Sequence, residues 1–518
     1  MPTRTDEVIW FEQLGRADVA LVGGKNASLG EMVSHLGERG VAVPPGFATH
    51  ARAFWRFIDS NQLREFIATT LDDLQAGRTT LPEAGQSIRR AILRGEWPKD
   101  TAAAIGGAYR ELCRRVARPD ADVAVRSSAT AEDLPDASFA GQQETFLNVR
   151  GEAALLDACQ RCFASLFTDR AISYRQTKGF DHLKVALSVG VQTMVRSDVG
   201  SAGVMFTIDT ETGFDKIVVI DAAWGLGETV VQGTVDPDEY QVFKPLLSQH
   251  SLTPIVEKRL GGKAQKMIYA REGDRPTRTV PTSRAERAAF VLTDQDILTL
   301  GRWGCVIEDH YGCPMDVEWA KDGESGALFI VQARPETVQS RKEVGEYRSY
   351  RIKSKGRTLV TGLSIGEAIV TGSVCLIESA RDIDRFVDGA ILVTQNTDPD
   401  WVPIMKRAAA IVTDRGGRTS HAAIVSRELG LPAIVGTGDA TQVLSDGQEV
   451  TASCAEGDQG FVYEGLAEYE VEKLDFSNLP PTRTQIMLNL GNPAAAFRWW
   501  RIAADGVGLA RMEFVISN

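Results

Sequence analysis

The feature that most constrains the fold is an alternation of helix-type and strand-type segments along the chain. Apolar residues recur at helical spacing over residues 27–40 and 52–74, which predicts helices there. Compact apolar runs such as Lys216-Ile-Val-Val-Ile-Asp221 and Leu328-Phe-Ile-Val331 predict short buried strands. Because alternating helices and strands bury their apolar faces by packing in layers, we expect an α/β protein of several domains.

Two polar, charged stretches divide the chain, and we expect linkers at residues 337–355 and 468–483. The units that they separate are residues 1–336, 356–467 and 484–518. The third unit holds a strand, a helix and the start of a second strand, which cannot bury their own apolar faces. It is therefore expected either to belong to a longer polypeptide or to pack on the earlier units.

Charge and cysteine content exclude some classes of partner. The chain has 57 basic and 69 acidic side chains and a net charge of -12, which repels phosphate backbones and anionic lipid. No run approaches the ~18 apolar residues of a membrane span, so neither nucleic acid nor membrane is an expected partner. The seven cysteines are scattered, and Cys159 and Cys162 are interpreted as packing residues, which favours a cytoplasmic protein.

The strongest chemical signal is Gly416-Gly-Arg-Thr-Ser-His421, which follows a strand-like apolar run. Either Thr419 or Ser420 is a suitable N-cap and Gly430 a suitable stop, so a short helix is predicted to place His421 in its first turn. The helix dipole and the unpaired backbone N–H groups there favour an anion over an imidazolium cation. A neutral imidazole at this position can act as a nucleophile and carry a phosphoryl group.

The residues around this histidine support the same chemistry. Arg415 and Arg418 are expected to bring positive charge to a phosphoryl group on His421. Gly416 and Gly417 have no side chains, so the backbone can approach that group closely. The alternative is a capping or core histidine, but the glycine pair, the arginines and the helix start together favour phosphoryl transfer.

Three polar segments of the first unit are candidate phosphate contacts. Val22-Gly-Gly-Lys-Asn-Ala-Ser28 is a glycine turn that leads into a helix with Lys25 at its mouth, although it lacks the spacing of a P-loop. Val123-Ala-Val-Arg-Ser-Ser-Ala-Thr-Ala-Glu-Asp133 places Arg126 after a short strand, and Ser138-Phe-Ala-Gly-Gln-Gln-Glu-Thr145 could fold over phosphates. For each segment the alternative is an ordinary turn or polar loop.

Two strands of the first unit carry polar side chains with a period of two. Asp316 and Glu318 share one strand face, and Gln332 and Arg334 share another. Oxygen ligands beside an arginine suit a magnesium–polyphosphate site, although exposed strand faces are often charged as well. Trp224-Gly-Leu-Gly-Glu228 follows a buried strand, where a turn explains it equally well.

Taken together, these segments resemble the phosphoenolpyruvate-utilising dikinases, in particular the phosphoenolpyruvate synthase (pyruvate, water dikinase) family, over essentially the whole chain. The matching segments are Gly23–Met32, Ala124–Asp133, Pro135–Thr145, Gln332–Glu336 and Gly416–Ile424. The resemblance implies an ATP-grasp-like nucleotide domain, a swivelling β/β/α phosphohistidine domain and the first elements of an incomplete (β/α)₈ barrel that binds pyruvate.

The resemblance also implies roles for single residues. His421 would be the phosphohistidine intermediate. The ATP site would comprise Lys25, Arg126, Gly141, Thr145, Gln192, Glu318, Gln332 and Arg334. Magnesium would be held by Asp316, Glu318 and Gln332. A regulatory kinase–phosphorylase would modify Thr419, where added negative charge would crowd His421, and Arg511 would bind the substrate's carboxylate or phosphate.

The implied reaction is gluconeogenic: ATP, pyruvate and water give AMP, phosphoenolpyruvate and phosphate. The chain ends at Asn518, before the rest of the implied barrel, so it is expected to carry only the ATP-to-histidine half-reaction. The resemblance leaves a homodimer open for the full-length protein. Two other hypotheses remain: an antibiotic (rifamycin-type) phosphotransferase of the same superfamily, and a non-enzymatic phosphocarrier or regulatory fragment.

Overall fold

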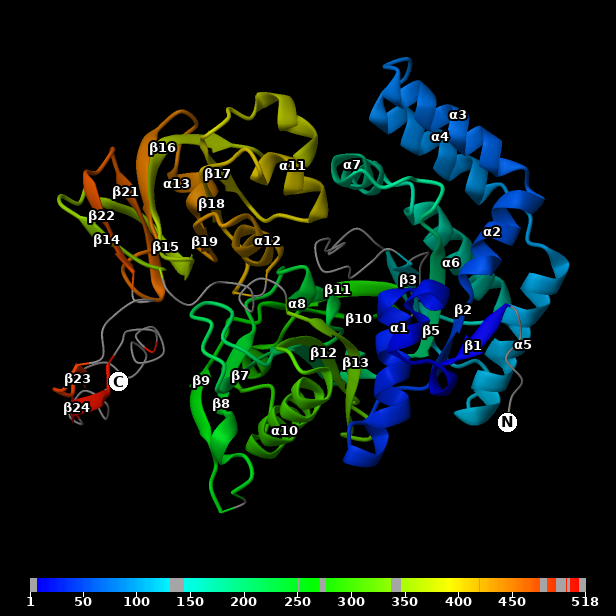
Figure 1. The fold of residues 1–518 in the computed structure, drawn as a ribbon, viewed down its shortest axis with the longest axis horizontal. Coiled ribbons are helices and arrows are strands. Elements are labelled where there is room, and N and C mark those ends of the chain that lie inside the picture. The colour runs from blue at the N-terminus through cyan, green and yellow to red at the C-terminus, as the bar shows by residue number, and fades with distance from the viewer. Residues whose placement is uncertain are drawn as a thin grey trace.

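A computed structural model shows how the helices and strands are arranged (Figure 1). It describes residues 7–130, 144–249, 251–270, 276–336, 346–418, 420–475, 482–490, 500 and 504–511. Helices and strands alternate through several separate sheets, so the expected multidomain α/β class is confirmed. Within the described residues, no helix is both long enough and apolar enough to cross a membrane.

The N-terminal lobe is built on a five-stranded antiparallel sheet. In spatial order its strands are β1 (Val8–Trp10), β2 (Gly46–Thr49), β5 (Leu187–Thr193), β3 (Val123–Ala129) and β4 (Thr145–Val149). Its helices are α1 (Val19–His35), α2 (Ala51–Ser60), α3 (Leu63–Gln75), α4 (Leu81–Leu93), α5 (Lys99–Arg115), α6 (Glu152–Ser165) and α7 (Asp169–Lys178). A core that includes Phe54, Phe57 and Phe163 joins this sheet to α2 and α6, and burial of these rings stabilises the lobe.

Two of these helices differ in extent from the sequence prediction. The helix expected over residues 27–40 begins eight residues earlier and ends at His35. The single helix expected over residues 52–74 is wrong: it is the separate helices α2 and α3. The break lies at Gln62, whose left-handed φ of 56° cannot continue a right-handed helix.

A second antiparallel sheet of six strands follows in the chain. In spatial order its strands are β13 (Leu328–Pro335), β12 (Met315–Lys321), β6 (Ser201–Phe206), β7 (Ile217–Trp224), β8 (Asp238–Phe243) and β9 (Ile255–Arg259). Beside it lie α8 (Glu228–Val231), α9 (Arg284–Ala288), α10 (Asp294–Tyr311) and the hairpin of β10 (Gln265–Tyr269) and β11 (Thr277–Pro281). Helix α10 covers β7, β8 and β12, while α1 contacts strands of both large sheets. The two sheets therefore share one helix that ties them together.

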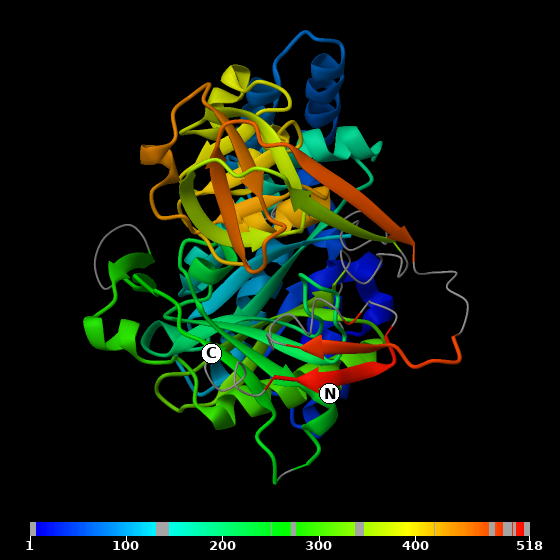
Figure 2. The ribbon, with the colours of Figure 1, turned by 90° about the vertical axis from the view of Figure 1, so that its left-hand side faces the viewer.

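The third sheet is a closed seven-stranded barrel. In order around the barrel its strands are β15 (Thr358–Ile365), β19 (Ala433–Val435), β18 (Ala410–Thr413), β17 (Ile391–Thr394), β16 (Ile369–Leu376), β20 (Glu449–Ser453) and β21 (Gln459–Glu464). Three short helices accompany it: α11 (Val402–Met405), α12 (His421–Leu429) and α13 (Ala440–Val443). Figure 2 shows this unit above the six-stranded sheet.

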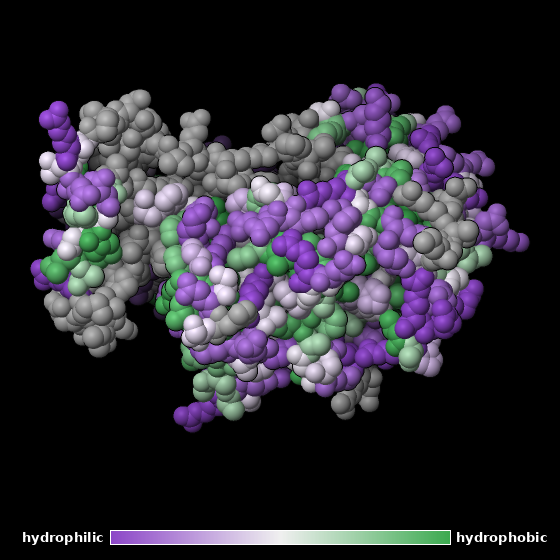
Figure 3. Space-filling view, turned by 60° about the horizontal axis from the view of Figure 1, so that its bottom comes forward, coloured by the Kyte–Doolittle hydropathy of each residue, from purple (hydrophilic) through white to green (hydrophobic). Residues whose placement is uncertain are grey.

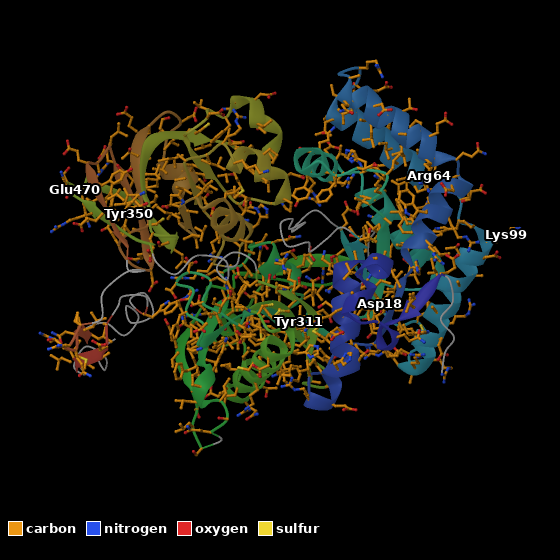
Figure 4. The ribbon with its side chains drawn as sticks, in the orientation of Figure 1. Asp18, Arg64, Lys99, Tyr311, Tyr350 and Glu470 are labelled. Atoms are coloured by element: carbon orange, nitrogen blue, oxygen red, sulfur yellow. The ribbon has the colours of Figure 1, made fainter. Side chains whose placement is uncertain are left out.

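Both segments expected to be linkers contain strands that pair with each other. β14 (Glu346–Ile352) and β22 (Tyr469–Asp475) form an antiparallel ribbon beside the barrel, where Tyr350 and Glu470 are labelled in Figure 4. The rings of Tyr350 and Tyr469 lie 6.4 Å apart, and Lys353 Nζ lies 2.8 Å from a carboxylate oxygen of Glu470. The polar character that suggested linkers reflects a two-stranded ribbon with little apolar surface to bury.

The last described elements are two parallel strands, β23 (Met487–Leu490) and β24 (Gly506–Ala510). Ile486, Met487, Val507 and Leu509 stay about half exposed there, at 45–51%. Figure 3, in which hydrophilic side chains cover most of the visible face, shows a small hydrophobic group at the edge where this pair lies. A two-stranded parallel pair alone does not bury these side chains.

Candidate functional site

Helix α12 carries the candidate nucleophile and begins where the sequence predicts. Ser420 is the N-cap, and its hydroxyl accepts a hydrogen bond from the backbone N–H of Ala423 at 3.4 Å. The helix ends before Gly430, which has a left-handed φ of 69°. His421 is thus the first helical residue, as expected, while Thr419 lies outside the described residues.

The imidazole of His421 is held in a neutral state and in one orientation. Burial, together with the positive charge of Arg170, lowers the pKa of His421 to about 4. Its Nδ1 lies 2.9 Å from the hydroxyl oxygen of Thr397, a buried residue. When Nδ1–H donates to this hydroxyl, Nε2 keeps its lone pair and is the nitrogen left for nucleophilic attack.

One cavity of about 700 Å³ brings His421 together with candidate nucleotide-site residues of the first unit. The predicted residues that line it are Lys25, Arg126, Thr145, Gln192, Glu318, Gln332 and Arg334. They come from α1, from three strands of the first sheet and from β12 and β13 of the second. His421 comes from the unit of residues 356–467 that contains the seven-stranded barrel, here called the barrel unit. Its volume lies within the ~300–1,000 Å³ typical of small-molecule sites.

Two paired strands, β12 and β13, contribute side chains to this cavity. Glu318 stands opposite Gln332, and Asp316 stands opposite Arg334. Arg126 lies nearby: its Nη2 is 3.8 Å from a carboxylate oxygen of Glu318. The period-two spacing in the sequence therefore corresponds to direct cross-strand pairs.

Asp316 and Glu318 lie on the same strand but differ in their positions relative to the cavity. Arg334 Nε donates to a carboxylate oxygen of Asp316 at 2.8 Å, and Asp316 is not among the residues that line the cavity. Glu318 and Gln332, in contrast, do line it. The structure thus separates the three candidate magnesium ligands into two that face the cavity and one that holds Arg334.

Five charged residues of the cavity lie outside the set that the sequence predicts: Glu144, Arg170, Glu228, Asp398 and Asp400. Arg170 of α7 lines the cavity, and its Nη1 is 3.5 Å from a carboxylate oxygen of Asp400 of the barrel unit. Glu228 of α8 lines it too, and burial, with the charge of Glu318, raises the pKa of Glu228. Glu228 belongs to the turn Trp224-Gly-Leu-Gly-Glu228, whereas Arg170 has no motif around it.

The expectation that Arg418 would bring positive charge to His421 is wrong. Its Nη2 lies 3.0 Å from a carboxylate oxygen of Asp458, and its Nε lies 4.0 Å from Glu239 of β8. Arg415 lines another cavity between the units, so neither arginine lines the cavity of His421. The loop before α12 thus places Arg418 between Asp458 of its own unit and Glu239 of the first unit, and Arg170 supplies the positive charge near the imidazole instead.

The remaining predicted residues stand apart from this cavity. Gly141 lies outside the described residues. Arg511 is exposed just after β24, where its backbone N–H donates to the carbonyl of Leu490 at 2.9 Å. It does not line the cavity of His421.

Family models of known proteins match residues in both larger units. A family model described as pyruvate phosphate dikinase, AMP/ATP-binding domain, matches residues 19–354. A second model, described as PEP-utilising enzyme, mobile domain, matches residues 386–457. Among solved structures, a solution structure of Enzyme I was matched at 30% identity with a TM-score of 0.14. The matched region covers 15% of this chain and 33% of the Enzyme I chain.

Curated relatives align with almost all of this chain. The phosphoenolpyruvate synthase of Synechocystis sp. is 54% identical, over 99% of this chain and 64% of that relative. Those of Aquifex aeolicus and Escherichia coli are 52% and 51% identical over 99% of this chain, and the chain spans 61% and 64% of their lengths. The chain therefore belongs to the pyruvate phosphate dikinase AMP/ATP-binding family, alongside these phosphoenolpyruvate synthases.

Proposed function

We propose that this chain transfers a phosphoryl group from ATP to His421 as the first half of a phosphoenolpyruvate synthase reaction. The observation that carries the proposal is the single cavity that His421 shares with seven candidate nucleotide-site residues. In the whole protein, ATP, pyruvate and water would give AMP, phosphoenolpyruvate and phosphate. The names of relatives at 51–54% identity support this reaction over other phosphotransferase chemistries.

The cavity offers each group that the first half-reaction requires. Lys25, Arg126 and Arg334 place positive charge where the triphosphate would bind, with Gln192 and Thr145 as further polar contacts. These contacts would fix the phosphates in line with the imidazole. ATP would therefore be bound by the first unit and attacked from the barrel unit.

In the proposed step, Nε2 of His421 attacks the β-phosphorus of ATP. The bond between that phosphorus and the oxygen bridging to the α-phosphate breaks, and AMP leaves with the bond's electron pair. Water then removes the γ-phosphoryl group as phosphate, so the β-phosphoryl group stays on His421. Arg170 would offset the negative charge that develops beside the imidazole, because its positive charge already acts on this ring and lowers the pKa of His421.

The oxygen donors of the cavity fit a magnesium ion. Glu318 and Gln332 face each other on two paired strands. The carboxylate of Glu228 is close enough to Glu318 for the charge of Glu318 to raise the pKa of Glu228. Two carboxylates and an amide oxygen are hard ligands of the kind that Mg²⁺ prefers. When bound, the ion would neutralise phosphate charge. Asp316 would orient Arg334 rather than bind the ion.

The domain plan and the remaining roles belong to the same proposal. Residues 1–336 would be an ATP-grasp-like domain, 356–467 a swivelling phosphohistidine domain, and 484–518 the start of a (β/α)₈ barrel. The parallel pairing of β23 and β24, with its exposed apolar side chains, is the arrangement that the first two barrel strands would have. Arg511 would bind pyruvate or phosphoenolpyruvate.

Regulation and cellular context follow from the same family relation. A kinase–phosphorylase acting on Thr419 would place negative charge two residues from His421 and oppose its phosphorylation. The whole protein would act in the cytoplasm, and the relation leaves a homodimer open there. The rival antibiotic phosphotransferase and the non-enzymatic phosphocarrier have no support from the named relatives.

Labelled ATP tests the proposal directly. The wild-type chain, incubated with ATP carrying label at the β-phosphate, should retain acid-labile label, while label at the γ-phosphate should appear as free phosphate. His421→Ala should retain no label yet bind ATP with wild-type affinity, because the imidazole belongs to the barrel unit and the phosphate ligands to the first unit. Retained label in the His421→Ala variant would overturn the assignment.

A matched pair of variants tests the nucleotide site. Arg126→Ala and Glu318→Ala should each weaken ATP binding by about tenfold or more, since each removes a charged group from the cavity. Glu324→Ala, which removes an exposed acid from the same unit, should leave ATP affinity unchanged. Equal ATP affinity in all three variants would contradict the proposed site.

A further inference from the structure

Far from the nucleotide cavity, Glu31, His35 and His310 form a compact cluster. One potential ligand atom from each residue lies within 4.8 Å of those of the others. His310 Nε2 is 2.7 Å and His35 Nδ1 is 3.5 Å from the same carboxylate oxygen of Glu31. Glu31 and His35 are four residues apart on α1, so they share one helix face, while His310 comes from the last turn of α10.

The separations in this cluster suit a small ion bound at its centre. Ligands about 2.0–2.1 Å from a tetrahedral zinc ion stand on the order of 3.3 Å from one another. The observed distances of 2.7 and 3.5 Å from the carboxylate oxygen to the two imidazole nitrogens bracket that separation, so these two distances would change little on binding. Two imidazoles and a carboxylate favour late first-row divalent ions over Mg²⁺, which prefers oxygen ligands.

The surrounding backbone also favours a cation. Helix α1 ends at His35 and α10 ends at Tyr311, so two helix C-termini, each carrying partial negative charge, converge at the cluster. Figure 4 shows Tyr311 labelled at the end of α10.

Arg16 orients the carboxylate and lies beside the cluster. Its backbone N–H donates to the second carboxylate oxygen of Glu31 at 3.0 Å, which turns the first oxygen toward the two imidazoles. Its guanidinium stacks on the ring of Tyr311 at 4.1 Å and donates to the carbonyl of His310 at 2.6 Å. Partners that hold ligand side chains in this way are typical of metal sites, although the guanidinium charge itself opposes a cation.

We propose that Glu31, His35 and His310 bind one zinc-class divalent cation, with water completing the coordination. The ion would join the ends of α1 and α10, and through them the two large sheets, as a structural brace. His35 lies ten residues beyond Lys25 along α1, about 15 Å from the nucleotide cavity, so this site is separate from the magnesium ligands. Metal binding at this site can therefore be tested independently of the proposed phosphoryl transfer.

Calorimetric titration of the chelator-treated full chain with Zn²⁺, without nucleotide, tests this site. The wild-type chain should bind one equivalent, and His35→Gln and His310→Gln should each weaken binding by at least about tenfold. His50→Gln removes a histidine outside the cluster and should bind as the wild type does. Arg16→Met keeps the orienting backbone N–H and removes the opposing charge, so it should bind more tightly.

Two further measurements exclude misfolding and cysteine binding as explanations. Zn²⁺ should raise the Tm of the wild type and of His50→Gln but not that of His310→Gln, each compared with its own metal-free form. Co²⁺ should give visible bands without sulfur-to-metal charge transfer, because no cysteine belongs to the cluster. Sulfur charge transfer, or equal Zn²⁺ affinity in His310→Gln and His50→Gln, would overturn the proposal.

Discussion

At the scale of single residues, the environment of His421 decides its chemistry. A free histidine with a pKa near 6.5 would be partly cationic in mildly acidic solution, whereas burial and Arg170 keep this one neutral. The hydroxyl of Thr397 occupies Nδ1 and thereby selects the other nitrogen for attack. The residues that tune this candidate nucleophile thus come from α7 and from the loop before α11, not from its own motif.

This environment predicts an unusual pH dependence. Because the pKa of His421 is lowered to about 4, the imidazole should stay unprotonated as pH falls through 6.5, and the single-turnover labelling rate should begin to fall only toward pH 4. Arg170→Met should move the midpoint upward. A wild-type midpoint near 6.5 would contradict this account.

At the scale of elements, the loop before α12 fits closely against the first unit. Gly233, just after α8, lies so near that an added Cβ would stand 2.2 Å from the Cβ of Ser420. Gly417 similarly lies against Pro237, where a Cβ would be 3.2 Å from Cδ. Glycines on both sides of the contact therefore allow the start of α12 to reach the cavity that His421 lines.

This contact predicts that a substitution can slow phosphoryl transfer to His421 without changing ATP binding. Gly233→Ala should leave ATP affinity unchanged but lower the labelling rate of His421 by about tenfold or more, since the methyl group would clash with Ser420. Gly233 has a φ of 64°, so backbone strain must be controlled for. Gly77→Ala is the matched control, because Gly77 has a φ of 69° and open space around its Cβ position. An equal loss of labelling in both variants would show that strain, not docking, is responsible.

At the scale of the whole molecule, buried ion pairs hold the barrel unit on the first unit. Arg427 of α12 donates from Nε to a carboxylate oxygen of Glu211 at 3.0 Å, and Gly366 N–H donates to the other oxygen at 3.4 Å. Although burial raises the pKa of Glu211, Arg427 and Arg418 lower it below its usual value. The carboxylate is therefore ionised when the units are docked.

Removing this charge should loosen the docked state. Glu211→Gln leaves Arg427 buried without its counter-charge, so the labelling rate should fall by about tenfold or more while ATP affinity stays the same. Small-angle scattering should show a larger radius of gyration for this variant. Glu324→Gln breaks an exposed pair with Arg196 inside the first unit and should change neither quantity. Unchanged labelling in Glu211→Gln would show that these pairs do not control docking.

Much of the candidate site was predictable because its signals are local. Ser420 and Gly430 set the ends of α12 through capping, and the period of two placed Glu318 and Gln332 on facing strands. Each of these features depends on neighbours in the chain or on a regular backbone geometry. For that reason the sequence alone could locate the candidate nucleophile and much of the candidate nucleotide site.

Tertiary structure alone decided which distant residues meet. Arg170 and Glu228 reach the cavity, and Arg418 turns away from it, because the units pack in one particular orientation. The meeting of His35 and His310, which are 275 residues apart, likewise depends on α1 and α10 ending at the same place. Such contacts arise from the packing of whole elements, for which a short stretch of sequence holds no local signal.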